Sequence, residues 1–203
     1  MSGYPILLRG PSITALVVGG GRVALRKVAS LLAADVRVCV VAPEVNAELH
    51  ELSEREPRLT IERRRFEEGD VRRATLVIAA TDDRATNARV AKVARDDRRL
   101  INVVDSAEQG NFTGMATHRS GDVVIAVSAG GVPRAAARIR DAIAERFDRR
   151  YGNAIEALGA LRRRMLDAGG ASGWKRAMDH LVDEQFCARV ESGAVGAEIE
   201  AWR

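Results

Sequence analysis

The chain has 203 residues, a net charge of +4 and 30% charged residues, so it is long enough for one domain with an extension or for two small domains. Only 4% of residues are aromatic, which predicts a core of valine, isoleucine, leucine and alanine, as in parallel strands covered by helices. Basic residues alternate with acidic ones and no apolar run could span a bilayer, so neither nucleic acid nor a membrane is an expected partner. Without a secretory leader or a paired-cysteine motif, we expect a soluble, cytoplasmic protein.

The first hundred residues alternate between short β-branched runs and segments of helical period. This order predicts an α/β fold, a Rossmann-like parallel sheet with helices between its strands. We expect a first helix beginning near Val23, with apolar residues on one face, and further helices at 45–55 and 85–95. The expected strands are residues 15–18, 36–41, 59–61, 76–80 and 100–104.

The pattern changes after Asp105. Residues 115–119 and 122–128 predict a β-hairpin around Ser120-Gly121, and Pro133 suits the first turn of a helix that runs to about residue 147. Beyond residue 148 the sequence is helical, with breaks expected at 169–170 and 172–173 and a frayed stretch around 192–193. We therefore expect a sheet domain at 1–113, a hairpin and helix at 114–148, and a helical region at 149–203.

Glycines lie between the first predicted strand and the first predicted helix. In the pattern G-x-G-x-x-G/A, the three key positions are Gly19, Gly21 and Ala24. The first allows a tight turn, the second lets a pyrophosphate approach the backbone, and the third lets helix and strand pack closely. A tight turn without a ligand is the alternative reading. Because the motif opens a βαβ unit, we expect a dinucleotide site.

An acidic residue after the second strand usually binds the ribose hydroxyls of NAD. Glu44 is the candidate, displaced by one or two positions, although a glutamate capping the next helix is an alternative. No arginine immediately follows that strand, so the sequence favours NAD over NADP.

Two further strands end in polar residues, where ligands of open α/β sheets bind. Thr81, Asp82 and Asp83 close the fourth strand, and Asn102 and Asp105 close the fifth. The acidic pair could equally cap the following helix. Asp105 has no following helix to cap, which makes it a candidate general base beside a nicotinamide.

A possible anion site follows the hairpin. Ser128 precedes a glycine pair and a helix that carries Arg134, an arrangement that suits a carboxylate or phosphate, or simply a turn with solvated arginines. His118 could face a site from the hairpin. The three histidines have no metal-ligand spacing, so no metal site is expected.

Several motifs, taken in order, resemble the precorrin-2 dehydrogenase family, whose module also forms the N-terminal part of siroheme synthases. The resemblance covers about residues 3–150. It rests on Leu16-Val17-Val18-Gly19-Gly20-Gly21, Ile78-Ala79-Ala80-Thr81-Asp82-Asp83 with Asn87, Asn102-Val103-Val104-Asp105, and Ile125-Ala126-Val127-Ser128 before Gly130-Gly131.

The resemblance implies oxidation of precorrin-2 to sirohydrochlorin with NAD as hydride acceptor, and in some members insertion of ferrous iron. It implies a homodimer built through residues 114–148, with the helical C-terminus covering the tetrapyrrole. Asp105 would be the catalytic aspartate. Cofactor contacts would come from Gly19, Gly21, Arg22, Val23, Pro43, Glu44, Thr81 and Asp82, and substrate contacts from Asn102, Ser128, Arg134 and His118.

Two departures from the family pattern bear on function. The chain stops at Arg203, so we expect no methyltransferase half, and Ala129 follows Ser128 where some members carry a regulated serine pair. Two other functions stay open: a non-catalytic NAD-sensing regulatory domain, and a chelatase that uses NAD only structurally.

Overall fold

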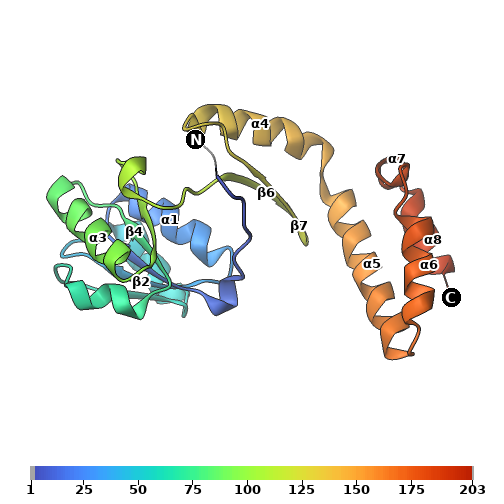
Figure 1. Cartoon of the computed structure of the whole chain (residues 1–203), viewed down its shortest axis with the longest axis horizontal. Coiled ribbons are helices and arrows are strands. Elements are labelled where there is room, and N and C mark those ends of the chain that lie inside the picture. Colours follow the sequence, from blue (N-terminus) through green and yellow to red (C-terminus); the bar gives the residue numbers. More distant parts are fainter. Residues whose placement is uncertain (1–2, 203) are drawn as a thin grey trace. The chain divides into compact units, whose positions relative to one another are not determined.

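The computed structural model describes residues 3–202, which divide after Gly114 into two compact units (Figure 1). The first unit is an α/β domain with a parallel sheet, and the second combines a β-hairpin with five helices. The predicted fold class, a Rossmann-like sheet followed by a helical C-terminal region, is confirmed.

The sheet of the first unit has five strands in the order β3-β2-β1-β4-β5, and every neighbouring pair is parallel. From β1 the chain adds strands in one direction, and it then returns to add β4 on the other side of β1. Open α/β sheets bind ligands where the strand order reverses in this way, outside the carboxyl ends of the strands. The strands are β1 (Thr14–Val18), β2 (Arg37–Val41), β3 (Leu59–Glu62), β4 (Leu76–Ala79) and β5 (Leu100–Val103).

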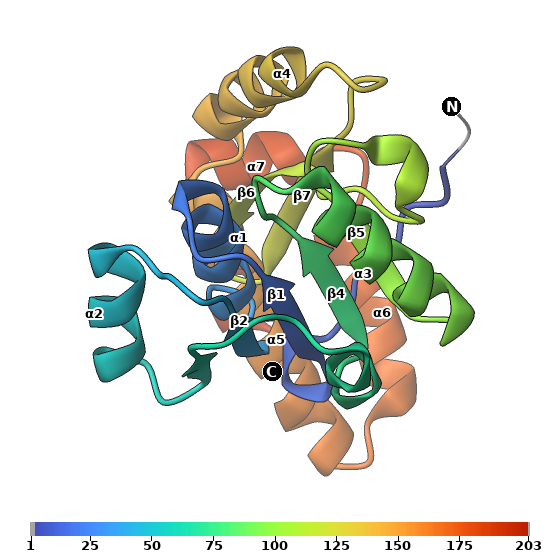
Figure 2. The same ribbon diagram turned by 90° about the vertical axis from the view of Figure 1, so that its left-hand side faces the viewer.

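Helices cover both faces of this sheet (Figure 2). On one face, α1 (Arg22–Leu32) buries Ala24, Val28 and Leu32, whose four-residue spacing places them on one side of the helix. The same core cluster includes Leu49 of α2 (Ala47–Arg55). On the other face lie α3 (Arg84–Asp96) and the short 3₁₀ helix Glu68–Arg73. The periodicity predicted the α-helices and strands to within a few residues, but not this 3₁₀ helix.

The hairpin of the second unit pairs β6 (Ala116–Ser120) with β7 (Val123–Val127). Ser120 pairs with Val123, so the two-residue turn is Gly121–Asp122, one position beyond the predicted turn. The backbone at Gly121 has a φ of +56°, which favours glycine. A Cβ there would lie 3.2 Å from the Cα of Gly152, so close packing also favours glycine. Two helices follow, α4 (Pro133–Arg146) and α5 (Arg149–Asp167).

The C-terminal helices are more continuous than the sequence predicted. The expected break at Ser172–Gly173 is wrong, because both residues lie in the first turn of α6 (Ala171–Leu181). A helix tolerates glycine in its first turn better than in its interior. The expected frayed stretch at Ser192–Gly193 is instead the joint between α7 (Phe186–Ser192) and α8 (Ala194–Ala201), where Gly193 has a φ of +83°. No helix within residues 3–202 is both long and apolar enough to cross a membrane.

Candidate dinucleotide site

A groove of about 910 Å³ opens at the carboxyl ends of β1, β2 and β4 in the first unit. All eight residues predicted to contact the cofactor line it: Gly19, Gly21, Arg22, Val23, Pro43, Glu44, Thr81 and Asp82. They come from the segments that follow β1, β2 and β4, including the first turn of α1, and these segments meet here because the three strands are neighbours in the sheet. Whether each residue contacts a cofactor remains a prediction.

The three glycines between β1 and α1 serve different purposes. Gly19 has a φ of +124°, and a Cβ there would lie 2.3 Å from the carbonyl oxygen of Ala80. A Cβ on Gly20 would lie 2.0 Å from the carbonyl oxygen of Glu44, so these two glycines let neighbouring loops approach. Gly21 has an ordinary extended backbone, and a Cβ there would meet nothing within 4 Å.

The N-terminus of α1 fits a pyrophosphate. Gly21 is its N-cap residue and has no side chain to bond to the first N–H groups of the helix, and no other side chain within residues 3–202 caps them. Those N–H groups and the positive end of the helix dipole face the open space beside Gly21, in the manner of a dinucleotide site.

Glu44 lies on the rim of the groove, three residues beyond the end of β2. The alternative role for Glu44 as a helix cap is wrong, because α2 is capped by Asn46, whose side chain accepts a hydrogen bond from the Leu49 N–H at 2.8 Å. The Asn46 N–H in turn donates to the carbonyl oxygen of Gly20 at 2.9 Å, which joins this loop to the glycine turn. The exposed Glu44 carboxylate therefore remains available to a ribose.

The two aspartates after β4 have different environments. Asp83 caps α3 by accepting hydrogen bonds from the N–H groups of Ala85 and Thr86. A hydrogen bond from the Thr86 hydroxyl, together with these two backbone bonds, lowers the pKa of its carboxyl group. Asp82 does not cap the helix and lines the groove. The capping alternative is therefore confirmed for Asp83 only.

Asn87 joins the end of β4 to Asp105. Its side chain is buried, its oxygen accepts from the Thr81 N–H at 3.1 Å and from the Thr81 hydroxyl at 2.7 Å, and its amide donates to the Thr81 carbonyl at 3.0 Å. The same amide donates to Oδ1 of Asp105 at 3.3 Å. Asp105 lies two residues beyond β5 and is partly exposed. A buried amide thus holds the candidate base next to the loop that bears Thr81.

Comparisons with known proteins agree with this geometry. A family model described as putative NAD(P)-binding matches residues 6–116, which include the whole groove. The chain belongs to this family. The predicted nicotinamide dinucleotide cofactor is thereby confirmed, in line with the uncapped helix and the open space at Gly21.

Individual relatives of this NAD(P)-binding chain carry more specific names. A siroheme synthase from Methylococcus capsulatus is 37% identical over 83% of this chain and 35% of its own length. Another, from Nitrosococcus oceani, is 32% identical over 97% of this chain and 43% of its own. The chain thus spans less than half the length of these relatives. The solved structure of SirC, a precorrin-2 dehydrogenase, matches 98% of this chain and 99% of its own, with a TM-score of 0.76 and 26% identity.

Asn102, predicted as a substrate contact, is a buried residue of β5. Its amide donates to the carbonyl oxygen of Phe112 at 3.2 Å and so holds the loop after the sheet. Its side-chain oxygen is buried and has no hydrogen-bond partner within residues 3–202. A role toward the substrate remains a prediction.

The other three predicted substrate contacts belong to the second unit. Ser128 follows β7 and Arg134 lies in the first turn of α4, and both are exposed. The His118 ring nitrogen Nε2 lies 2.6 Å from the carbonyl oxygen of Phe147, so this side chain links the hairpin to the end of α4. Their contacts with a substrate remain predictions.

Sequence reasoning missed several residues that line the groove. Arg65 and Phe66 follow β3, and Arg89 lies on α3 with its guanidinium 5.8 Å from the centre of the Phe66 ring. The signal for Arg65 is the parallel pairing of β3 with β2, which brings the ends of both strands to one edge. Within the described part of the chain, no group of three or more histidine, cysteine, aspartate or glutamate side chains is placed to hold a metal ion.

Proposed function

We propose that the chain is an NAD-dependent dehydrogenase that oxidises precorrin-2 to sirohydrochlorin in siroheme biosynthesis. The observation that carries this proposal is the likeness to SirC, a precorrin-2 dehydrogenase, over nearly the full length of both chains. The groove supports it, because a dinucleotide site and a carboxylate beyond the neighbouring strand occur in one unit. The two siroheme synthases match 83% and 97% of this chain with 35% and 43% of their own length.

The reaction removes two hydrogen atoms from the macrocycle, one as a hydride and one as a proton. Bound NAD supplies the hydride acceptor. The chain must hold the cofactor, orient the macrocycle and accept the proton. We assign the proton to the carboxylate of Asp105, whose Oδ1 accepts a hydrogen bond from Asn87 and whose partial exposure leaves it accessible.

Precorrin-2 carries several carboxylates, so its binding site should contain cationic and hydrogen-bonding groups. Arg134, Ser128 and His118 are the proposed contacts in the second unit, and Asn102 in the first. Arg134 is exposed and has no ion-pair partner within residues 3–202, so its charge is free for a substrate carboxylate.

We further propose that the protein acts as a homodimer in the cytoplasm. Val132 is the N-cap residue of α4, and Ile139 lies within this helix. The two residues are 55% and 48% exposed, as expected of apolar residues that a second copy covers. Cys39 and Cys187 are free thiols, which fits a reducing compartment. Sedimentation of Ile139→Asp beside the unaltered protein tests the dimer, and an unchanged sedimentation coefficient would count against this face.

The test of the reaction is incubation of the protein with precorrin-2 and NAD without oxygen, while the absorbance of sirohydrochlorin and NADH is followed. We expect one NADH for each sirohydrochlorin formed. A regulatory NAD-sensing domain would bind NAD and leave precorrin-2 unchanged. Sirohydrochlorin formation at the rate of a protein-free control would overturn the proposal.

A further inference from the structure

We propose that Arg65 is a cofactor-specificity residue, which pairs with a 2′-phosphate on the adenosine ribose and lets the groove accept NADP as well as NAD. The proposal rests on the NAD(P)-binding site and not on the identity of the oxidised substrate. It runs against the expectation from sequence, in which the absence of an arginine directly after the second strand disfavoured NADP.

The register of the sheet brings Arg65 to the ribose end of the groove. Val41, the last residue of β2, pairs with Glu62, the last residue of β3, and the Ala42 N–H continues the pairing by donating to the Glu62 carbonyl at 3.2 Å. The two chains therefore leave the sheet side by side, and Arg65 lines the same groove as Pro43 and Glu44. In Rossmann domains the ribose 2′ position lies at the end of the second strand, where an arginine accommodates a phosphate.

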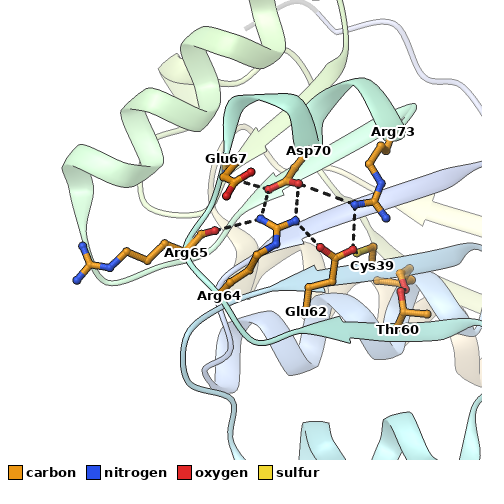
Figure 3. Close-up of polar contacts among 9 residues, drawn as sticks. Cys39, Thr60, Glu62, Arg64, Arg65, Glu67, Asp70 and Arg73 are labelled. Atoms are coloured by element: carbon orange, nitrogen blue, oxygen red, sulfur yellow. Dashed lines mark hydrogen bonds and ion pairs between the residues drawn. The ribbon is translucent and has the colours of Figure 1, made fainter.

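An ion-pair cluster beside Arg65 orients the loop (Figure 3). The Arg64 guanidinium donates two hydrogen bonds to the buried Asp70 carboxylate, at 2.7 and 2.9 Å, and also pairs with Glu62. Arg73 bridges to Glu62 at 2.9 Å. The Asp70 carboxylate also accepts from the Glu67 N–H at 3.0 Å, so both ends of the segment 64–67 are held.

This cluster leaves the charge of Arg65 uncompensated. The charges of its two arginines, Arg64 and Arg73, are balanced by those of its two carboxylates, Glu62 and Asp70. The cluster contacts Arg65 only through its backbone, where the carbonyl oxygen accepts a hydrogen bond from Arg64 at 3.1 Å. Figure 3 shows the Arg65 side chain extending away from the cluster. Within residues 3–202 its guanidinium makes no hydrogen bond or ion pair, although it lines a groove for a phosphorylated ligand.

Glu44 has the opposite effect on a 2′-phosphate. Its carboxylate favours a ribose hydroxyl and repels a phosphate, whereas Arg65 attracts the phosphate. The balance of the two sets the ratio of the affinities for NADP and NAD. Substituting Arg65 should therefore change that ratio and not merely weaken both ligands equally.

The experiment is calorimetric titration of the full chain with NAD and with NADP. We expect Arg65→Ala to raise the ratio of Kd for NADP to Kd for NAD about tenfold, as for loss of a partly exposed charged hydrogen bond. Arg65→Lys should restore part of the loss, because it keeps the charge without the bidentate geometry. Arg63→Ala is the matched control, since Arg63 is exposed, carries the same charge and does not line the groove.

Asp70 binds Arg64 and the Glu67 N–H, and we infer that it thereby positions the backbone of Arg65; the same titrations test this role. Asp70→Asn should raise the ratio less than Arg65→Ala does, with the thermal melt showing that the protein is folded during the titration. A ratio in Arg65→Ala that equals that of Arg63→Ala would overturn the proposal. Because only binding is measured, a failure to oxidise precorrin-2 would leave this result intact.

Discussion

The two units hold their predicted ligand-binding residues in different ways. In the first unit, the groove is formed by loops that follow parallel strands, and its shape depends on backbone contacts at Gly19, Gly20 and Asn46. In the second unit, the predicted substrate residues lie on a hairpin and at the start of α4, and one of them, His118, bonds to the carbonyl of Phe147. The predicted cofactor contacts thus follow from the chain direction after parallel strands, whereas the predicted substrate contacts of the second unit depend on single side chains.

The largest effect is expected from a substitution that removes the proposed general base and leaves the backbone of the groove unchanged. Asp105→Asn keeps the shape of the side chain and an oxygen that can accept from Asn87. We expect NAD affinity and folding to be unchanged, and turnover to fall by about 10²–10⁴-fold, as for loss of a general base. Single-turnover oxidation of precorrin-2 at saturating NAD measures this. A rate within a few-fold of the unaltered enzyme would mean that the proton leaves directly to water.

The next largest effect is expected at Gly21, where a substitution should weaken NAD binding without unfolding the protein. Gly21→Asp places a carboxylate where the pyrophosphate should lie, and like charges in that position should weaken NAD binding by at least about a hundredfold. The fold should survive, because Gly21 has an extended backbone, space for a side chain and an N-cap position that aspartate favours. Calorimetry and thermal melts measure the two properties.

Gly19→Ala is the contrasting variant for that experiment. Its Cβ would lie 2.3 Å from the Ala80 carbonyl at a positive φ, so we expect it to lower the melting temperature. NAD affinity retained in Gly21→Asp would contradict the assignment of the groove.

Substitutions of Asn87 test how much its buried amide contributes to stability and to turnover. Asn87→Ala leaves the Thr81 N–H without its partner, which should cost about 1–3 kcal/mol of stability, and it frees Asp105 to reorient, which should lower kcat about tenfold. Asn87→Asp keeps the shape of the side chain but replaces the amide donor with a second carboxylate beside Asp105, so it should lower kcat at least as much as Asn87→Ala does.

Asn111 offers the matched control for Asn87. Its side chain accepts from the Ile101 N–H at 2.8 Å and donates to the Arg99 carbonyl at 2.9 Å. Asn111→Ala should therefore cost similar stability without lowering kcat. If both alanine variants lower kcat equally, Asn87 acts only through stability.

The smallest predicted effect concerns acid stability. Arg64 lowers the pKa of Asp70 below its ordinary value of about 3.9, so the carboxylate contributes stability above that pH and loses it as the pH falls through the lowered pKa. Asp70→Asn should be less stable than the unaltered protein by about 1–3 kcal/mol near pH 7. Urea unfolding should show the difference constant down to about pH 5 and narrowing below about pH 4. A gap that widens in acid would contradict this sign.

The sequence alone predicted the parts of the first unit that depend on local pattern. Alternating strands and helices specify the sheet, and the glycine turn identifies the groove, because periodicity and turn geometry are properties of short segments. Arg65 was missed because its place in the groove depends on which strand pairs with β2. Asn87 was noticed only as part of a motif, since its bonds reach from α3 to residues on two other elements.

The second unit was harder to predict for the same reason. The partner of His118 lies 29 residues away, and no local pattern indicates it. Ser172–Gly173 suggested a break in the helix, yet a Cβ on Gly173 would lie 3.0 Å from the terminal methyl group of Met165 on α5. That methyl group is the end of a flexible side chain and can move, so packing does not require glycine here. The chain changes direction before this position, at Gly169, where the backbone has a φ of +74°.

The run of three glycines carries a consequence for how this family can change over evolutionary time. Gly19 and Gly20 are required by contacts within the protein, whereas no contact within residues 3–202 requires glycine at position 21, where we predict that a pyrophosphate approaches the backbone. A lineage that no longer needs the cofactor would retain selection on the first two positions and lose it on the third. Side chains at position 21 in otherwise intact descendants would therefore mark domains that have kept this fold and abandoned dinucleotides.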